Sequence, residues 1–223
     1  MHLRHEWKHL ILPIDKLALH TRLSAVMEPD PHAIHGLYLV RSLYFDNLYD
    51  TVLRDKIDGV DHREKFRLRL YNNDPSLILL EKKCKHNGLC SKEQERLTLE
   101  ETAILTRGEY HSLATDEKPL LRELVGRMDT HGLRPRTLVD YKREPFIYAP
   151  GNVRVTLDYE IRTGLRCTDF LNPACTMIPV PDDPIILEVK WDAYLPGVIR
   201  DLVQTPTTRT SAFSKYAACR SYC

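Results

Sequence analysis

Charged side chains recur at every second position in several segments of the sequence. Lys65, Arg67 and Arg69 alternate with apolar residues, and Glu188 and Lys190 do the same. Successive side chains of a β-strand point to opposite faces, so the charges of each segment would share one face. Lysine and arginine donate charge-assisted hydrogen bonds to phosphate oxygens, and carboxylates are the hard oxygen ligands that Mg²⁺ or Mn²⁺ requires. Faces of this composition could therefore bind a phosphate chain together with a divalent metal ion.

Other segments repeat the alternation, and two arrangements of the strands could explain it. Taken singly, each charged face is typical of the solvated side of an open sheet. Taken together, the strands and the helices between them favour a barrel whose apolar faces point outward and whose charged faces line the interior. Such an interior must be wet and neutralised by an anionic ligand and by its own carboxylates, because an unpaired buried charge costs several kcal/mol. The remaining charged faces are those of Glu6 and Lys8, of Glu81, Lys83 and Lys85, and of Arg154, Thr156, Asp158, Glu160 and Arg162.

The elements that would position these side chains are eight strands separated by helices. Period-two alternation predicts strands over 6–12, 36–45, 64–71, 77–85, 90–98, 137–148, 153–162 and 185–191. Apolar stripes and capping residues predict helices over 15–27, from 98 onward, and over 118–128, 196–203 and 211–220. No internal repeat or linker rich in Gly, Pro or Ser interrupts the chain. We therefore expect a single domain over residues 1–223 with a mainly β (α+β) fold.

Composition limits the classes of partner. The 223 residues carry 32 basic and 31 acidic side chains, a formal net charge of +1. A general attraction to nucleic acid or to a membrane surface is therefore not expected, and anion binding must be local. The sequence has neither a membrane-spanning stretch nor the apolar core of a signal peptide, so we expect a cytoplasmic protein. Its six cysteines lack zinc-ligand spacing and are predicted to be free thiols, with a Cys167–Cys175 disulfide as the less favoured alternative.

Eight short segments together carry a family resemblance over nearly the whole chain. They are RHEWK at 4–8, SLYFDN at 42–47, KFRLRLY at 65–71, LEKK at 80–83, YKR at 141–143, RVTLD at 154–158, LEVK at 187–190 and FSKY at 213–216. In this order they resemble the VTC domain, the polyphosphate polymerase domain of the CYTH or triphosphate tunnel metalloenzyme superfamily, and particularly its bacterial single-domain members. The resemblance implies an eight-stranded antiparallel β-barrel tunnel with a polar lumen, flanked by helices and a C-terminal helix.

The resemblance also implies roles for particular residues. Glu188 would be the leading metal ligand, with Glu6 as a second carboxylate, and the ion would be Mn²⁺ or Mg²⁺. Arg4 stands where the superfamily's ExExK motif has its first glutamate, which favours the VTC branch over the triphosphatases and argues against a two-metal site on the first strand. The residues carried over as phosphate ligands are Lys8, Arg67, Arg69, Lys83, Arg143, Arg154 and Lys190, with Lys215 on the C-terminal helix and, less securely placed, Lys92. Those expected to act in catalysis are Lys8, Arg67, Arg69, Lys83, Arg143 and Glu188.

The activity implied is transfer of the γ-phosphate of ATP to a growing polyphosphate chain. Phosphoryl transfer requires little covalent chemistry of the protein, because alignment in a basic tube and a metal ion on the transferred group supply most of the catalysis. Two alternatives stay open: a metal-dependent triphosphatase with water as acceptor, and a non-catalytic module that binds polyphosphate or nucleotide. The sequence has no Walker motif and no HExxH pair of histidines. It indicates no nucleic-acid partner and identifies no protein partner.

Overall fold

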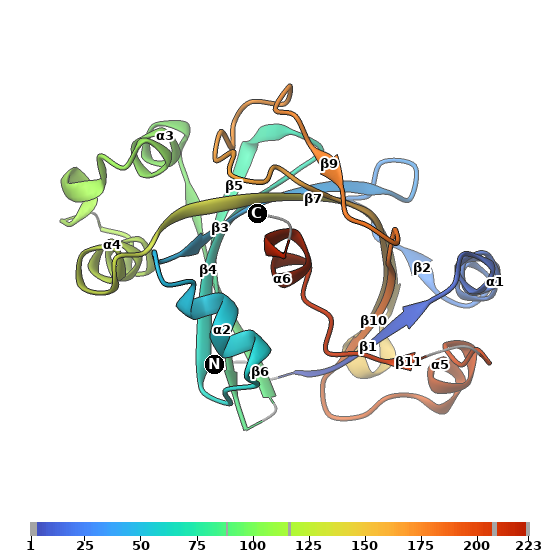
Figure 1. Cartoon of the computed structure of the whole chain (residues 1–223). Helices are drawn as coiled ribbons and strands as arrows, with labels where there is room; N and C mark the ends of the chain where they lie inside the picture. Colours follow the sequence, from blue (N-terminus) through green and yellow to red (C-terminus); the bar gives the residue numbers. More distant parts are fainter. Residues whose placement is uncertain (1–3, 88, 116, 207–208, 222–223) are drawn as a thin grey trace.

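Eight long antiparallel strands curl around a common axis in the computed structural model, which describes residues 4–87, 89–115, 117–206 and 209–221 (Figure 1). Their order in the sheet is β1-β10-β8-β7-β3-β4-β5-β6. The eight strands expected from the alternation are confirmed. The long strands are β1 (His5–Ile11), β3 (Tyr38–Asp46), β4 (Arg63–Tyr71), β5 (Asp74–His86), β6 (Leu89–Leu97), β7 (Arg134–Tyr148), β8 (Val153–Thr163) and β10 (Ile185–Trp191). Three two-residue strands join them: β2 (Glu28–Pro29) on β7, β9 (Ile178–Pro179) on β8 and β11 (Arg209–Thr210) on β1.

The two ends of the curled sheet meet along a seam between β1 and β6. Within the described residues, the seam is hydrogen-bonded only where the Arg4 N–H donates to the Cys90 carbonyl at 3.4 Å. β1 is otherwise laddered to β10 along its whole length. The barrel is therefore curled but not fully closed by backbone hydrogen bonds.

Helices lie mainly on the outside of this barrel. They are α1 (Pro13–Ser24), α2 (Thr51–Ile57), α3 (Leu99–Arg107), α4 (Pro119–His131), α5 (Gly197–Leu202) and α6 (Lys215–Arg220), with short 3₁₀ turns η1 (Tyr110–Leu113) and η2 (Pro150–Asn152). Five of the six helices were expected from the sequence, and α2 was not. None of the helices in the described residues has the length and apolar composition needed to span a lipid bilayer.

The outward faces of the strands are apolar and covered by helices, as expected. Leu121 and Leu124 of α4 pack with Phe66, Leu68 and Leu80 of the sheet. Across the barrel, α1 and α5 pack on β8 and β10 in a second cluster. Each fully buried leucine or phenylalanine contributes about 1.5–3 kcal/mol relative to an exposed one, so the outer clusters stabilise the barrel.

One helix, α6, lies inside the ring of strands (Figure 1). Tyr216 of α6 stacks on Tyr44 with ring centroids 4.9 Å apart, and its hydroxyl donates to Asp46 Oδ2 at 2.6 Å. Tyr141 and Ile161 complete the apolar cluster around it. Part of the interior is therefore packed with apolar and aromatic side chains, a feature that the charged alternation did not predict.

The alternation of β8 breaks at Glu160, which corrects one expectation. Arg154 to Arg162 were expected to present every second residue to one face, but Glu160 has a left-handed backbone (φ 49°) and the pairing with β7 shifts register there. The bulge turns Ile161 into the interior cluster. Glu160 instead pairs with Lys142, at 2.7 Å.

The cysteines in the described part of the chain are free thiols, as expected. Cys84, Cys90, Cys167 and Cys175 are partly buried, and Cys219, a residue of α6, is buried. Cys223 lies outside the described residues.

Candidate functional site

A cavity of about 360 Å³ lies in the charged part of the barrel interior. Its walls come from β1, β3, β4, β5, β6, β7, β10 and β11, from α2, and from α6 with the segment before it. The structure brings most of the predicted site residues together here. Those that line the cavity are Glu6, Lys8, Arg67, Arg69, Lys83, Arg143, Glu188, Lys190 and Lys215.

Glu188 lies at the centre of a group of three cations. The antiparallel register sets Lys8 of β1 directly opposite Glu188 of β10. Glu188 Oε1 is 2.7 Å from Lys190 Nζ and 3.6 Å from Lys8 Nζ, while Arg143 Nη2 donates to Oε2 at 3.3 Å. Burial opposes the charge of Glu188, but these cations outweigh it and hold its pKa well below the usual range. The carboxylate is therefore ionised at neutral pH.

Glu6 provides a second ionised carboxylate on the neighbouring strand. It is opposite Lys190 in the β1–β10 register and contacts Lys83 Nζ at 2.9 Å. Burial and the proximity of Glu188 raise its pKa, but Lys83, Lys8 and Lys190 outweigh them and lower the pKa to about 2. Both predicted metal-ligating residues thus carry a negative charge in the same part of the cavity.

Asp158 holds two of the predicted phosphate ligands. The Arg143 guanidinium donates to both oxygens of this fully buried carboxylate, at 2.7 and 2.8 Å, and Lys215 Nζ lies 2.6 Å from Oδ2. Burial opposes its ionisation, but Arg143 and Lys215 prevail and lower the pKa of Asp158 to about 2. The pairing fixes α6 to the barrel wall and aims Lys215 into the interior.

Glu81 pairs with two cations of β4, Arg67 and Arg69. Arg67 Nε donates to Glu81 at 2.7 Å, and Arg69 Nη1 lies 3.5 Å away. Arg67 also donates to the Tyr44 hydroxyl at 2.8 Å, and Arg69 to the Tyr141 hydroxyl at 3.2 Å. Both guanidiniums are thereby held in fixed orientations on one wall.

Lys65 belongs to the same wall but was not among the predicted site residues. It lines the cavity on the face that it shares with Arg67 and Arg69. Of the described carboxylates, none lies within ion-pair distance of it. Burial and the nearby Lys83, Arg67 and Lys8 lower the pKa of Lys65 to about 7. The alternation that identified Arg67 and Arg69 was the signal that could have added Lys65.

Tyr44 lies below Lys65, whose Nζ is 5.5 Å from the ring centroid. Burial opposes ionisation of the phenol, but Arg67, Lys65 and Arg69 outweigh it and lower the pKa of Tyr44 to about 7. Burial likewise lowers the pKa of Lys190 to about 8, so Lys65, Tyr44 and Lys190 are cavity groups whose charges change near neutral pH.

Two predicted phosphate ligands do not line the cavity. Lys92 is about half exposed and pairs with Glu81 at 3.2 Å, behind Arg67. Arg154 is opposite Lys190 in the β8–β10 register, but its guanidinium pairs with Asp30 at 3.0 Å. Their roles as phosphate ligands stay predictions.

Positive charge exceeds negative charge in this group of residues. The cavity is lined by eleven basic side chains and three carboxylates, namely Lys8, Lys56, Arg63, Lys65, Arg67, Arg69, Lys83, Lys85, Arg143, Lys190 and Lys215 against Glu6, Glu64 and Glu188. Two further carboxylates, Glu81 and Asp158, pair with lining arginines. The carboxylates satisfy only part of the cation charge, and the remainder favours a multivalent anion in the cavity.

The two carboxylates on β1 and β10 also suit a hard divalent cation. Mg²⁺ is usually bound by one or two carboxylates, water and the phosphate oxygens of a substrate, rather than by a cage of protein ligands. Glu6 and Glu188 are ionised and lie in the same part of the cavity, so this donor set fits Mg²⁺ or Mn²⁺.

A family model of the VTC domain matches residues 3–223. The chain belongs to the VTC domain family. This confirms the resemblance carried by the eight sequence segments and assigns the chain to the superfamily of metal-dependent triphosphate tunnel enzymes. None of the curated proteins compared with the chain matches it.

Solved structures resemble the chain at low sequence identity. A candidate adenylate cyclase from Bacillus halodurans superimposes with a TM-score of 0.53 at 12% identity, covering 85% of this chain and 80% of that one. The PH1012 protein from Pyrococcus horikoshii OT3 gives a TM-score of 0.48 at 10% identity and covers 95% of this chain and 96% of its own. The first likeness supports the predicted tunnel fold and, at this identity, the fold alone.

Proposed function

We propose that this VTC domain is a metal-dependent polyphosphate polymerase that transfers the γ-phosphate of ATP to the end of a polyphosphate chain. The observation that supports the proposal is the excess of cations over carboxylates in one cavity, with ionised Glu6 and Glu188 on adjacent strands. A polyanion would neutralise the excess, and a divalent ion would be held by the two glutamates.

In this reaction a terminal oxygen of the polyphosphate attacks the γ-phosphorus of ATP. A new P–O bond forms to the acceptor, the bond to the β-phosphate oxygen breaks, and ADP leaves with the electron pair. The attacking oxygen is already ionised at neutral pH, so no side chain has to remove a proton. This agrees with a cavity lined by cations that orient phosphates rather than by a nucleophile with its base.

The wall residues have distinct tasks in this mechanism. Arg67 and Arg69, fixed by Glu81 and the two tyrosine hydroxyls, would grip neighbouring phosphates of the triphosphate. Lys8 and Lys190, which contact Glu188, would also donate to phosphate oxygens of the substrate, and Glu188 with Glu6 would hold the metal ion. The bound metal ion would withdraw charge from the transferred phosphate and help to align donor and acceptor.

Hydrolysis of a triphosphate would use the same residues with water as the acceptor. Incubating the protein with ATP and Mn²⁺, and resolving the products by size, separates the possibilities. We expect ADP and long-chain polyphosphate in equal phosphate equivalents. Orthophosphate alone would make the domain a triphosphatase, and tight ATP binding without either product would make it a binding module.

Glu188→Gln tests the metal ligand within the same assay. Because the substitution removes charge and keeps shape, we expect it to abolish turnover while ATP affinity in chelator stays equal or rises. Glu109→Gln, which changes an exposed glutamate paired with Arg107, is the matched control. If Glu188→Gln made product at the wild-type rate, Glu188 would be a structural partner of Lys190 instead.

A further inference from the structure

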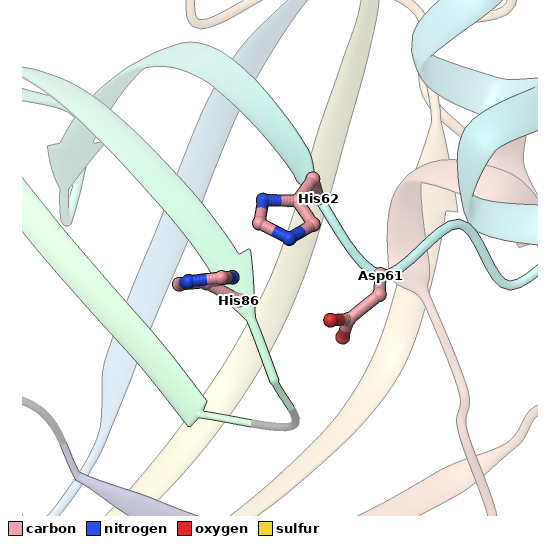
Figure 2. Close-up of side chains that lie close together, drawn as sticks. All are labelled: Asp61, His62 and His86. Carbon is pink, nitrogen blue, oxygen red and sulfur yellow. The ribbon is translucent and has the colours of Figure 1, made fainter.

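Two histidines and an aspartate converge at the rim of the barrel, away from the residues used above. His62 and Asp61 lie in the segment before β4, and His86 is the last residue of β5 (Figure 2). The β4–β5 ladder pairs Arg63 with Lys85, so one further step of the antiparallel register places His62 opposite His86. The two imidazole centroids are 3.9 Å apart, and one ligand atom of each of the three residues lies within 4.8 Å of the others.

We infer that Asp61, His62 and His86 form a binding site for a first-row divalent transition-metal ion such as Co²⁺ or Zn²⁺. Two imidazole nitrogens and one carboxylate oxygen are a donor set that such ions favour, and all three side chains are exposed and accessible to an ion from solution. It is the only group of this kind in the described part of the chain.

The distances allow coordination after small side-chain rotations. Donor atoms about 2.1 Å from a shared ion are about 3.4 Å apart in a tetrahedral site. The exposed side chains can close the difference by changing their χ angles. Asp61 is already oriented, since its Oδ2 accepts a hydrogen bond from the Asn87 N–H at 2.8 Å. Metal-bound carboxylates commonly have such a supporting hydrogen bond.

The rim site is separate from the carboxylates of the cavity. Asp61, His62 and His86 are not among the described residues that line the cavity. The two places also differ in chemistry. Glu6 and Glu188 offer only oxygen, which suits Mg²⁺, whereas the imidazoles select transition metals. An ion at the rim would tie the segment before β4 to the end of β5.

Titration with Co²⁺, followed by calorimetry and visible absorption in excess Mg²⁺, tests the site. We expect the wild-type protein to bind one more equivalent of Co²⁺ than His62→Ala or His86→Ala, and to gain thermal stability from Co²⁺ that these variants do not gain. His111→Ala is the matched control, because His111 is an exposed histidine beside a single carboxylate, Asp129 at 3.7 Å. It should behave as wild type.

Two results would overturn the inference. One is equal stoichiometry and affinity for Co²⁺ in wild type and in both rim variants. The other is a thiolate charge-transfer band accounting for the bound Co²⁺, which would place the ion on Cys84 or Cys90. Glu188→Gln should still bind the equivalent of Co²⁺ at Asp61, His62 and His86. Absence of Co²⁺ binding at the rim can therefore be distinguished from absence of the proposed polymerase activity.

Discussion

Individual cations of the cavity are oriented by carboxylates before any ligand binds. Asp158 accepts two hydrogen bonds from the Arg143 guanidinium, and Glu81 accepts one from Arg67. Without these partners, burying the guanidinium charges would destabilise the folded state. The carboxylates therefore stabilise the ligand-free domain and leave donor groups available to a polyanion.

Arg67→Ala and Arg69→Ala should each weaken ATP binding. Each removes a charge-assisted contact of about 1.5–3 kcal/mol, which corresponds to roughly a 10- to 100-fold loss of affinity. Calorimetry at two salt concentrations measures the loss, and the salt dependence of binding should fall as well. Arg107→Ala, at an exposed arginine paired with Glu109, is the control. If the double variant bound ATP with wild-type affinity, Arg67 and Arg69 would not belong to the ATP-binding site.

ATP affinity should depend on pH through Lys65. Because burial and its basic neighbours lower the pKa of Lys65 to about 7, the side chain is charged below that pH and neutral above it. A bound triphosphate favours the charged form, so the contribution of Lys65 to affinity should be lost as pH rises through about 7, by about tenfold.

The variant Lys65→Arg isolates this effect, since a guanidinium stays charged throughout the range. Calorimetric affinities from pH 6 to 9, taken as the ratio of wild type to variant, also cancel the titration of ATP itself. The ratio of wild-type affinity to Lys65→Arg affinity should fall as pH rises, because only the wild type loses the charge at position 65. A ratio that does not change with pH would show that Lys65 is protonated throughout.

At the scale of elements, local patterns predicted most of the fold. Period-two alternation located the eight strands, and Thr98 with Glu101 formed the predicted start of α3 as a capping box. Helix α2 could not be predicted, because it buries none of its residues and its first N–H groups are bound by Asp46 from a neighbouring strand. Its stability is tertiary in origin.

Features of the site that the sequence did not predict also depend on tertiary contacts. Alternation placed Arg154 correctly on the strand opposite Lys190, but only the folded chain brings Asp30 to its guanidinium. The turn of Ile161 inward depends on a bulge at Glu160 that no residue type in the sequence requires. Charge spacing thus predicts which face a residue occupies, whereas its partners depend on contacts across the barrel.

Tyr216→Phe should destabilise the domain through one hydrogen bond between elements. The hydroxyl of this buried residue of α6 donates to Asp46, which also binds the start of α2. Its loss should cost about 1–3 kcal/mol. Urea unfolding should show a lower midpoint with an unchanged slope.

Tyr49→Phe is the matched control for this substitution, because the side chain is 72% exposed. It should change the free energy of unfolding by no more than about 0.5 kcal/mol. Equal midpoints for the two variants would mean that α6 is not held by the Asp46 contact.

At the scale of the whole molecule, the net charge of +1 conceals a segregated distribution. A cluster of cations lies inside the barrel. An interior of eight strands is just wide enough for side chains or one small ligand. Tripolyphosphate should therefore displace labelled ATP, whereas duplex DNA at equal phosphate concentration should not. Fluorescence anisotropy at low ionic strength measures both, and displacement by the duplex would indicate an outer phosphate-binding surface.

The pairing of β1 with β10 sets the order in which the domain can assemble. Hairpins such as β4–β5 and β5–β6 join neighbours in sequence and can form while the chain is still being made, but β1 waits for a strand near the other end of the sequence. Until then its edges are unpaired and open to association with other chains. We expect pulsed hydrogen exchange during refolding to show the β1 amides protected last, so the cavity would appear only at the final step.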